Sequence, residues 1–257
     1  MAGLSALPPI LLGLAVPGVL LFAWWLAVVR GWATPLTLPA PGSVVRALLD
    51  MCHDGTLSAN LATSLRRAAI GFAFGAVAGL GLGATMGLSR TAELLLRPGL
   101  MAIVQVPVLA WIPLLMIPCG IGETLKYVTI GVAAFSPILV NTAKGFRQVS
   151  PALVEVGALY RFTTIQRLRH ILIPGALPPL FTGLRLGMTQ GWHSLVVVEL
   201  VASTEGIGYL AVMARQMFQL DVMLATMAVI GIVGFALDRS LRAAEAWCGR
   251  RFGGQLA

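Results

Sequence analysis

The feature that most limits what this chain can fold into is its series of long apolar segments. A helix needs about 18 or more mostly apolar residues to cross a bilayer, and six segments of the 257-residue chain approach or reach that length: 8–29, 68–88, 100–117, 127–142, 177–201 and 222–237. With 58% hydrophobic and only 11% charged residues, the composition is unlike that of a soluble domain. The sequence predicts an all-α membrane protein with six transmembrane helices.

The first apolar segment and the polar stretch after it form the predicted N-terminal part, residues 1–57. Residues 8–29 lack the basic start and cleavage site of a secretory signal, so we interpret them as a retained helix. A helix start at residues 41–43 then precedes apolar residues at helical spacing, which indicates a short amphipathic helix on the outer surface. Its charged residues are expected to face water: Arg46, Asp50 and Asp54. Residues 58–257 form the predicted membrane core.

The basic residues favour one orientation in the membrane, because cytoplasmic loops carry an excess of Lys and Arg. With six crossings and both termini in the cytoplasm, the inner set is Arg90, Arg97, Lys144, Arg147, Arg161, Arg167, Arg169, Arg239, Arg242, Arg250 and Arg251. The smaller outer set is Arg30, Arg46, Arg66, Arg67, Lys126 and Arg215. Arg30 alone favours the reverse orientation, since no Lys or Arg precedes the first span. The excess of Lys and Arg in the cytoplasmic loops thus explains the net charge of +8, and no nucleic-acid partner is expected.

The second apolar segment carries a glycine at every fourth position. The residues are Gly71, Gly75, Gly79, Gly83 and Gly87. Residues four apart lie close together on one side of a helix, and small residues there let another helix approach closely in lipid. We predict a tightly packed helix pair whose second member is either another helix of this chain or a second copy of it.

Residues 150–174 form a basic island between the fourth and fifth spans. Ser150-Pro151 is typical of a helix start, and Thr163 with Gln166 matches a capping box that begins a second helix. Pro174 is expected to end that second helix before the fifth span. From the residues alone, this hairpin is either a docking surface for another protein or an amphipathic element lying on anionic lipid.

The island resembles the "EAA" loop of permease subunits of binding-protein-dependent ABC importers. That pattern has Glu-Ala-Ala, three residues, Gly, nine residues and Ile-x-Leu-Pro. Glu155 takes the Glu position, and residues 171–174 (Ile-Leu-Ile-Pro) match the end of the pattern. Val156 and Gly157 replace the alanines, and Arg161 replaces the glycine, where it adds bulk and charge to a tight turn. Residues 113–146 and 206–233 also resemble this family, and the likeness extends from about residue 38 to near the C-terminus.

The resemblance implies a type I ABC importer permease that works as a homodimer with two cytoplasmic ATPase subunits and a periplasmic solute-binding protein. The island would be the coupling helix, and the residues implied in contact with the ATPase are Glu155, Val156, Gly157, Arg161, Ile171 and Pro174. The sequence itself contains no G-x-x-x-x-G-K-[ST] phosphate loop. No cofactor is therefore expected on this chain, and ATP and Mg²⁺ belong on the partner ATPase. The likeness is greatest to the branch that imports sulfonates, taurine, nitrate or pyrimidine precursors, with an aliphatic sulfonate as first choice.

Polar or aromatic side chains inside the spans are candidates for the solute path, since such groups are costly in lipid. Neutral hydrogen-bond donors would suit an anionic solute, and the candidates are Gln105, Trp111, Ser136, Asn141, His193 and Ser194, with Gln190 and Trp192 beside them. Each of these also fits a plain structural role, such as bridging helices. Glu199 would repel an anion, so we expect it to cap or bridge structure near the outer face.

Two other classes of function are weighed against a permease. An intramembrane enzyme would need a catalytic cluster or a metal site, and outside Asp50, His53 and Asp54 no ligand-like spacing occurs; no catalytic or metal-binding residue is therefore predicted. An ion-gradient-driven secondary transporter or channel is the stronger alternative. Such carriers place ionisable groups at mid-membrane depth, and here only His193 and, nearer one end, Glu199 qualify.

Overall fold

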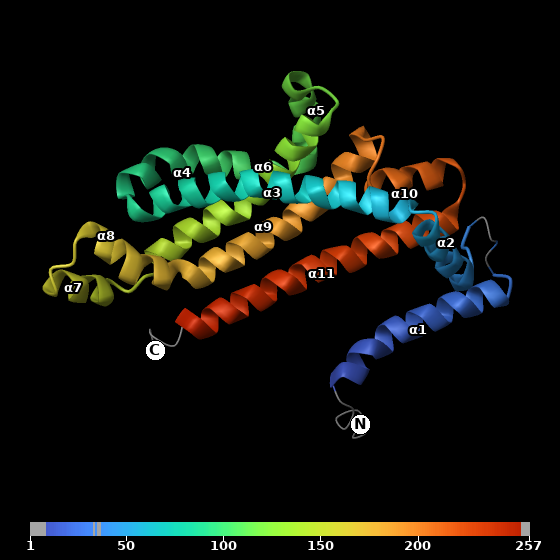
Figure 1. The fold of residues 1–257 in the computed structure, drawn as a ribbon, viewed down its shortest axis with the longest axis horizontal. Helices are drawn as coiled ribbons and strands as arrows, with labels where there is room; N and C mark the ends of the chain where they lie inside the picture. The colour runs from blue at the N-terminus through green and yellow to red at the C-terminus, as the bar shows by residue number, and fades with distance from the viewer. Residues whose placement is uncertain (1–8, 33, 35–36, 253–257) are drawn as a thin grey trace. The chain divides into compact units, whose positions relative to one another are not determined.

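The computed structural model describes residues 9–32, 34 and 37–252, and all regular elements of these residues are helices (Figure 1). The confirmed fold class is therefore all-α. The chain divides into two compact units, one of residues 1–59 with 210–229 and one of residues 60–209 with 230–257. The helices are α1 (Pro9–Val29), α2 (Pro41–His53), α3 (Thr56–Leu88), α4 (Arg90–Val104), α5 (Val108–Cys119), α6 (Glu123–Arg147), α7 (Pro151–Leu159), α8 (Thr164–Arg167), the π-helical turn η1 (Leu168–Leu172), α9 (Ile173–Ala202), α10 (Ile207–Gln216) and α11 (Leu220–Phe252).

The smaller unit contains α1 and α2. The Trp24 indole N–H donates to the carbonyl oxygen of Pro39 at 3.0 Å and ties the end of α1 to the segment before α2. The helix predicted from residues 41–43 onward is confirmed as α2, which begins with a proline and leaves Arg46 and Asp50 exposed. Pro8, with which the first predicted span begins, lies outside the described residues. The predicted boundary between residues 57 and 58 stays a prediction.

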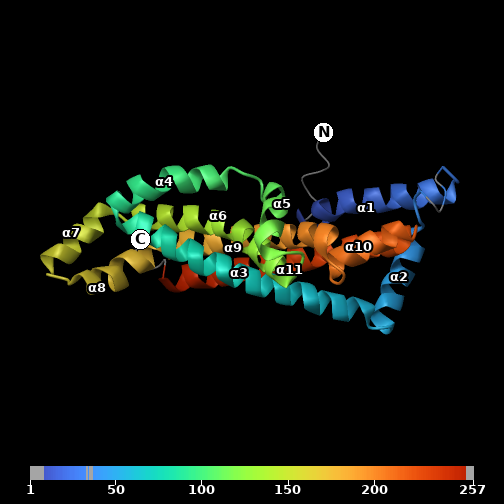
Figure 2. The same cartoon turned by 90° about the horizontal axis from the view of Figure 1, so that it is seen from above.

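The larger unit is a helix bundle in which α6 lies between α3 and α9 (Figures 1 and 2). All five glycines of the predicted ladder face α6, so the second helix of the pair is in the same chain. A Cβ on Gly75 would lie 2.5 Å from the carbonyl oxygen of Gly131, and one on Gly83 would lie 2.8 Å from that of Leu139. Since no real Cβ approaches an atom so closely, the spacing of the two backbones depends on these glycines.

A second glycine series, on α9, packs against the other side of α6. A Cβ on Gly187 would lie 2.7 Å from Cδ1 of Ile138, and one on Gly183 would lie 2.9 Å from Cβ of Asn141. From Ile230 onward, α11 packs on α9, and the Trp192 indole N–H donates to the carbonyl oxygen of Ile230 at 3.2 Å. Helix α6 is therefore the centre of the bundle, and Ile130, Ala134, Ile138 and Leu139 on it are buried.

The predicted third span, residues 100–117, is wrong as a single straight helix. Helix α4 ends at Val104, α5 begins at Val108, and the two are bent by 98°. The break follows from Pro107, which has no N–H for a helical hydrogen bond and which here adopts an extended conformation with φ −56° and ψ 135°. The polar residue Gln105 closes α4 at this break.

By length and composition, four helices of the described residues can cross a membrane: α3, α6, the continuous segment Thr164–Ala202, and α11. The bent pair of α4 and α5 raises the number to five if it counts as one span, and α1 contributes a shorter apolar helix. Multiple crossing helices are thus present, while the predicted count of six stays a prediction.

Candidate functional site

The island of residues 150–174 folds as a helical hairpin at one end of the larger unit (Figures 1 and 2). Helix α7 begins with Pro151 at its first position, as expected, although the Ser150 side chain makes no capping hydrogen bond. The capping box is confirmed, because the Gln166 N–H donates to Oγ1 of Thr163 at 3.3 Å and the Thr163 N–H donates to Oε1 of Gln166 at 2.8 Å. The turn between the short helices α7 and α8 therefore has a defined geometry.

Arg161 makes that turn in the left-handed conformation, with φ +54°. Its N–H donates to the carbonyl oxygen of Ala158 at 2.9 Å, and the Phe162 N–H donates to that of Gly157 at 2.9 Å. These two bonds form a Schellman motif, the helix end for which glycine is preferred. The tight turn thus forms with an arginine in the glycine position of the resembled pattern, at the cost of backbone strain that glycine would not carry.

The expectation that Pro174 ends the second helix is wrong. Helix α8, η1 and α9 form one continuous segment from Thr164 to Ala202. The turn Leu168–Leu172 is π-helical, and the Ile173 N–H donates to the carbonyl oxygen of Leu168, five residues earlier. This wider turn just before Pro174 relieves the clash that a proline ring makes with an ordinary α-helical turn. The hairpin is consequently joined to α9 without a break.

The outer surface of the hairpin is apolar as well as charged. Leu159, Tyr160 and Ile165 are 83%, 74% and 76% exposed, and Glu155 and Val156 are also exposed. Gly157 faces inward, where a Cβ would lie 2.6 Å from Cδ1 of Ile171, so α7 packs on η1 through these two residues. The six residues implied in ATPase contact therefore divide into three groups. Glu155, Val156 and Arg161 are exposed, Ile171 and Pro174 are half-buried, and Gly157 is buried.

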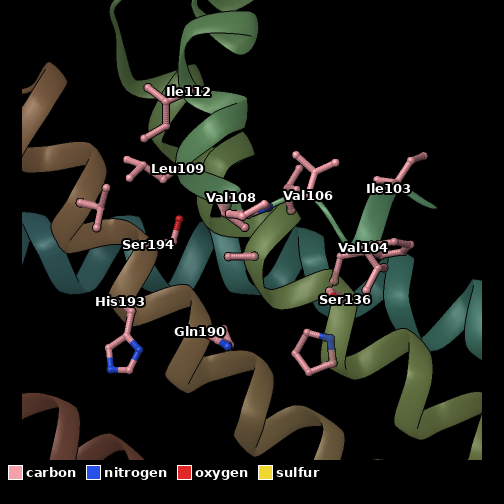
Figure 3. A pocket seen from close by; sticks show the side chains of 16 residues that line it. Ile103, Val104, Val106, Val108, Leu109, Ile112, Ser136, Gln190, His193 and Ser194 are labelled. Atoms are coloured by element: carbon pink, nitrogen blue, oxygen red, sulfur yellow. The ribbon is translucent and has the colours of Figure 1, made fainter. Parts of the chain in front are cut away.

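A cavity of about 400 Å³ lies where the bend between α4 and α5 meets α6 and α9. Ser136 of α6 and Gln190, His193 and Ser194 of α9 line it, together with apolar residues of the bend (Figure 3). Ser194 is buried, and its hydroxyl donates to the carbonyl oxygen of Thr129 at 3.4 Å, whereas Gln190 and His193 are exposed. Three of the six predicted path residues are thus brought together.

The other three predicted path residues do not line this cavity. Asn141 donates to the carbonyl oxygen of Pro137 at 2.8 Å within α6. Gln105 is exposed beside the bend. The buried indole Nε1 of Trp111 has no hydrogen-bond partner among the described residues. Asn141 accordingly has a structural role in its own helix.

Sequence reasoning missed an ionic network at the end of the larger unit that lies away from the hairpin, where α6 begins and α9 ends. Arg67 of α3 is fully buried, and its guanidinium donates to Glu123 at 2.9 Å, to Glu199 at 2.9 Å and to Glu205 at 2.8 Å. It also donates to the carbonyl oxygen of Glu205 at 2.8 Å. Lys126, itself buried, bonds to Glu123 at 2.7 Å. A guanidinium offers five N–H donors in a fixed plane, and here all three of its nitrogens have acceptors.

Glu199 extends this network to the start of α10. It accepts from the Ser64 hydroxyl at 2.8 Å and from the Gly208 N–H at 2.9 Å, and the Ile207 N–H donates to the Ser64 hydroxyl at 2.9 Å. The free N–H groups of a helix start favour a negative charge. Gly206 is required beside it, because its φ is +107° and a Cβ there would overlap the carboxylate of Glu199. These contacts agree with the expectation that Glu199 bridges structure.

The sequence around each charged residue of this network does not indicate that these residues meet. Its members are far apart in the sequence, and the usable hint was only that each charged residue borders an apolar run. The network joins α3, α6, α9 and the start of α10 at one point, so it fixes the helix ends. No group of three or more His, Cys, Asp or Glu side chains that could hold a metal ion occurs in the described ranges.

A family model matches most of the chain. Residues 71–252 match the model described as "Binding-protein-dependent transport system inner membrane component". The chain belongs to this family. It is accordingly the permease subunit of an ABC transporter, a multi-pass membrane protein that works with a separate ATPase and a solute-binding protein, and it is not an enzyme.

Curated relatives cover nearly the whole chain. The taurine transport system permease protein TauC of Escherichia coli (strain K12) is 36% identical over 91% of this chain and 87% of its own length. A Bacillus subtilis (strain 168) protein, SsuC, carries the name of an aliphatic sulfonates transport permease and is 35% identical over 91% and 84%. The bicarbonate transport system permease protein CmpB of Synechococcus elongatus is 31% identical over 72% and 66%.

A solved structure shows the same fold. The inward-facing MetNI methionine ABC transporter contains a chain that superposes with a TM-score of 0.65 at 17% identity, covering 76% of this chain and 97% of that one. This likeness supports a type I importer architecture for the helix bundle.

Proposed function

We propose that the chain imports a small anionic solute across the inner membrane, and that the solute is an aliphatic sulfonate or taurine. The relatives named for taurine and aliphatic sulfonates cover about nine-tenths of the chain at 35–36% identity, which supports this class over the bicarbonate of the more distant relative. Nitrate and pyrimidine precursors are the further solutes of the resembled branch.

The observation that carries the mechanism is the exposed apolar hairpin. Leu159, Tyr160 and Ile165 project from a well-formed turn at the end of the bundle, and such a surface favours burial against a protein groove. We place an ATPase subunit there, with ATP and Mg²⁺ bound on that subunit. Because the hairpin continues directly into α9, its displacement would move α9 and the cavity residues that α9 carries.

The stoichiometry and orientation form part of the same proposal. A homodimer would bind two ATPase subunits, with both termini and the hairpin in the cytoplasm and the Arg67 network toward the binding protein outside. The exposed position of Gln190 and His193 within a membrane-crossing helix favours a face turned to a water-filled path or to the second copy, because lipid would not satisfy these polar groups. The solute would pass this face by alternating access as the ATPase dimer closes and opens.

The first experiment tests ATPase docking. Glu155→Lys reverses an exposed charge on α7, and we expect it to reduce co-purification of the ATPase while membrane insertion stays normal. Asp50→Lys is the matched control, since Asp50 is an exposed carboxylate on α2. Co-purification at wild-type yield with Glu155→Lys would contradict the docking site.

The second experiment separates the importer from an ion-driven carrier and names the solute. We expect proteoliposomes that contain the permease, its ATPase and its binding protein to accumulate taurine or an alkanesulfonate. This uptake should require ATP on the side of the membrane where the ATPase is bound. Uptake that persists without the ATPase and depends on an ion gradient would support the secondary transporter instead.

A further inference from the structure

A second charged cluster lies at the hairpin end of the bundle, on α4 and α6. Its centre is Glu93, whose side chain is only 4% exposed. Arg97 donates to it at 2.8 Å and Arg90 at 3.1 Å, and Arg147 of α6 forms a further ion pair with it. Arg147 also donates to the carbonyl oxygen of Met86 at 3.2 Å, at the end of α3. One carboxylate thus orients three guanidinium groups and leaves most of their charge uncompensated.

Part of this cluster opens into a cavity of about 260 Å³. Arg97, Lys144 and Arg147 line it, and Gln148 adds an amide. Lys144 is exposed and has no hydrogen-bond or ion-pair partner within the part of the chain that the structure describes. The remaining lining is apolar and includes Met86, Met101 and Leu139. The cavity therefore combines three cations with an apolar wall.

The cavity lies beside a surface suited to lipid. Helix α4 carries Arg97 next to Leu94 and Leu95, which are 64% and 76% exposed. The same helix is amphipathic, with Glu93 on its buried side. Exposed leucines directly beside paired arginines are typical of a helix at the boundary between the hydrocarbon and the headgroups.

We propose that this cavity binds the phosphate of an anionic phospholipid. The groups of Arg97, Lys144 and Arg147 match an oxyanion, because guanidinium and ammonium groups donate several charge-assisted hydrogen bonds to it. The apolar wall then contacts the start of the acyl chains. Basic pockets between membrane helices bind acidic headgroups in this way. Free phosphate carries the same chemistry without the tail, so the test separates the two sources.

The experiment uses the full-length permease in its complex with the ATPase, purified in detergent and depleted of lipid. Native mass spectrometry measures binding of dioleoyl-phosphatidylglycerol and, for comparison, of the zwitterionic dioleoyl-phosphatidylcholine. Lys144→Gln removes a cation that has no partner, so it leaves the fold intact, and Arg97→Gln removes a second. We expect phosphatidylglycerol affinity to fall about fivefold for each removed charge, and phosphatidylcholine binding to stay the same.

Arg66→Gln is the matched control, because it removes one exposed positive charge at the other end of α3. It should leave phosphatidylglycerol binding unchanged. If inorganic phosphate displaces the lipid and loses affinity in the same variants, the cavity binds an oxyanion from solution as well. The proposal is overturned if phosphatidylcholine binds as tightly as phosphatidylglycerol, if Lys144→Gln and Arg97→Gln have no effect, or if Arg66→Gln weakens binding equally. None of these outcomes depends on the solute that is transported.

Discussion

The two ends of the larger unit differ in how completely the chain itself covers and pairs their side chains. At one end, Arg67 is buried and paired with Glu123, Glu199 and Glu205, and the backbone N–H groups of α10 are drawn into the same network. At the other end, the hairpin leaves Leu159 and Ile165 uncovered. The first end is complete within one chain, whereas the second presents apolar surface that water covers poorly.

This difference indicates different roles. A buried charge is tolerated only with full pairing, and a fully paired network holds its helices in one arrangement. The Arg67 end therefore acts as a fixed point for α3, α6 and α9. In the proposed mechanism, a partner covers and displaces the hairpin end, and the unbroken segment from Thr164 to Ala202 would carry that movement into the bundle.

The largest expected effect comes from removing the centre of the closed end. Arg67→Met leaves Glu199 buried without its cation, and breaking a buried ion pair in this way costs about 3–5 kcal/mol. We expect a large fall in the apparent melting temperature and in the yield of folded protein, measured by differential scanning fluorimetry in detergent. The neighbouring exposed residue supplies the control, since Arg66→Met should change stability by less than about 0.5 kcal/mol. Equal effects of the two variants would mean that the network does not hold the helix ends.

The seam between the two ends gives the next effect. Gly75→Ala places a Cβ against the carbonyl oxygen of Gly131, which is backbone and cannot swing away. Separating α3 from α6 should cost about 1–3 kcal/mol, measured by denaturant titration in mixed micelles. Gly81→Ala on the same helix has nothing within 4 Å and should be neutral or slightly stabilising. A loss of stability with Gly81→Ala as large as with Gly75→Ala would refute close packing at the ladder.

The next effect is expected at the open end, and it concerns docking alone. Leu159→Asp puts a charge into the surface that the ATPase would cover. Loss of one central apolar contact costs about 2 kcal/mol, which is roughly a thirtyfold weaker affinity for the ATPase, measured by surface-based binding assays with permease in nanodiscs. Ile121→Asp is the control, because Ile121 is 76% exposed and lies just before α6, at the end of the larger unit opposite the hairpin. The two ends would not differ as described if Ile121→Asp weakened binding as much.

The smallest effect tests the turn itself. Arg161→Gly removes the strain of a side chain in the left-handed conformation and should stabilise the protein by about 1 kcal/mol. A β-branched residue tolerates this conformation poorly, so Arg161→Val should destabilise it. Thermal unfolding of the two variants, compared with wild type, gives the sign of each change. A lower melting temperature for Arg161→Gly would show that the arginine side chain makes a contribution larger than its strain.

Local patterns predicted the parts of the fold that depend on neighbours in sequence. The amphipathic helix α2, the capping box of Thr163 and Gln166 and the glycine ladder all follow from spacing within a few residues. The bend at Pro107 was not predicted, since a proline in an apolar run is compatible with a kinked helix as well as with a broken one. The sequence predicts a helix end at Pro174, because the π-helical turn that accommodates this proline has no sequence signature of its own.

The candidate site was predicted only where it rests on local motifs. The hairpin was found from its caps and from the resemblance, and its exposure on the surface agrees with a docking role. The Arg67 network could not be found in that way, because its carboxylates come from three elements that meet only in the folded bundle. For the same reason Ser136 and Ser194 share a cavity while Asn141 does not.

The different roles of the hairpin end and the Arg67 end are tested most directly by hydrogen–deuterium exchange of the permease in nanodiscs, with and without its ATPase subunits. We predict that the ATPase slows backbone exchange across residues 151–172 and leaves residues 199–208 unchanged. Unchanged exchange in the hairpin, together with protection at the Arg67 end, would contradict the assignment of the hairpin as the site where the ATPase binds.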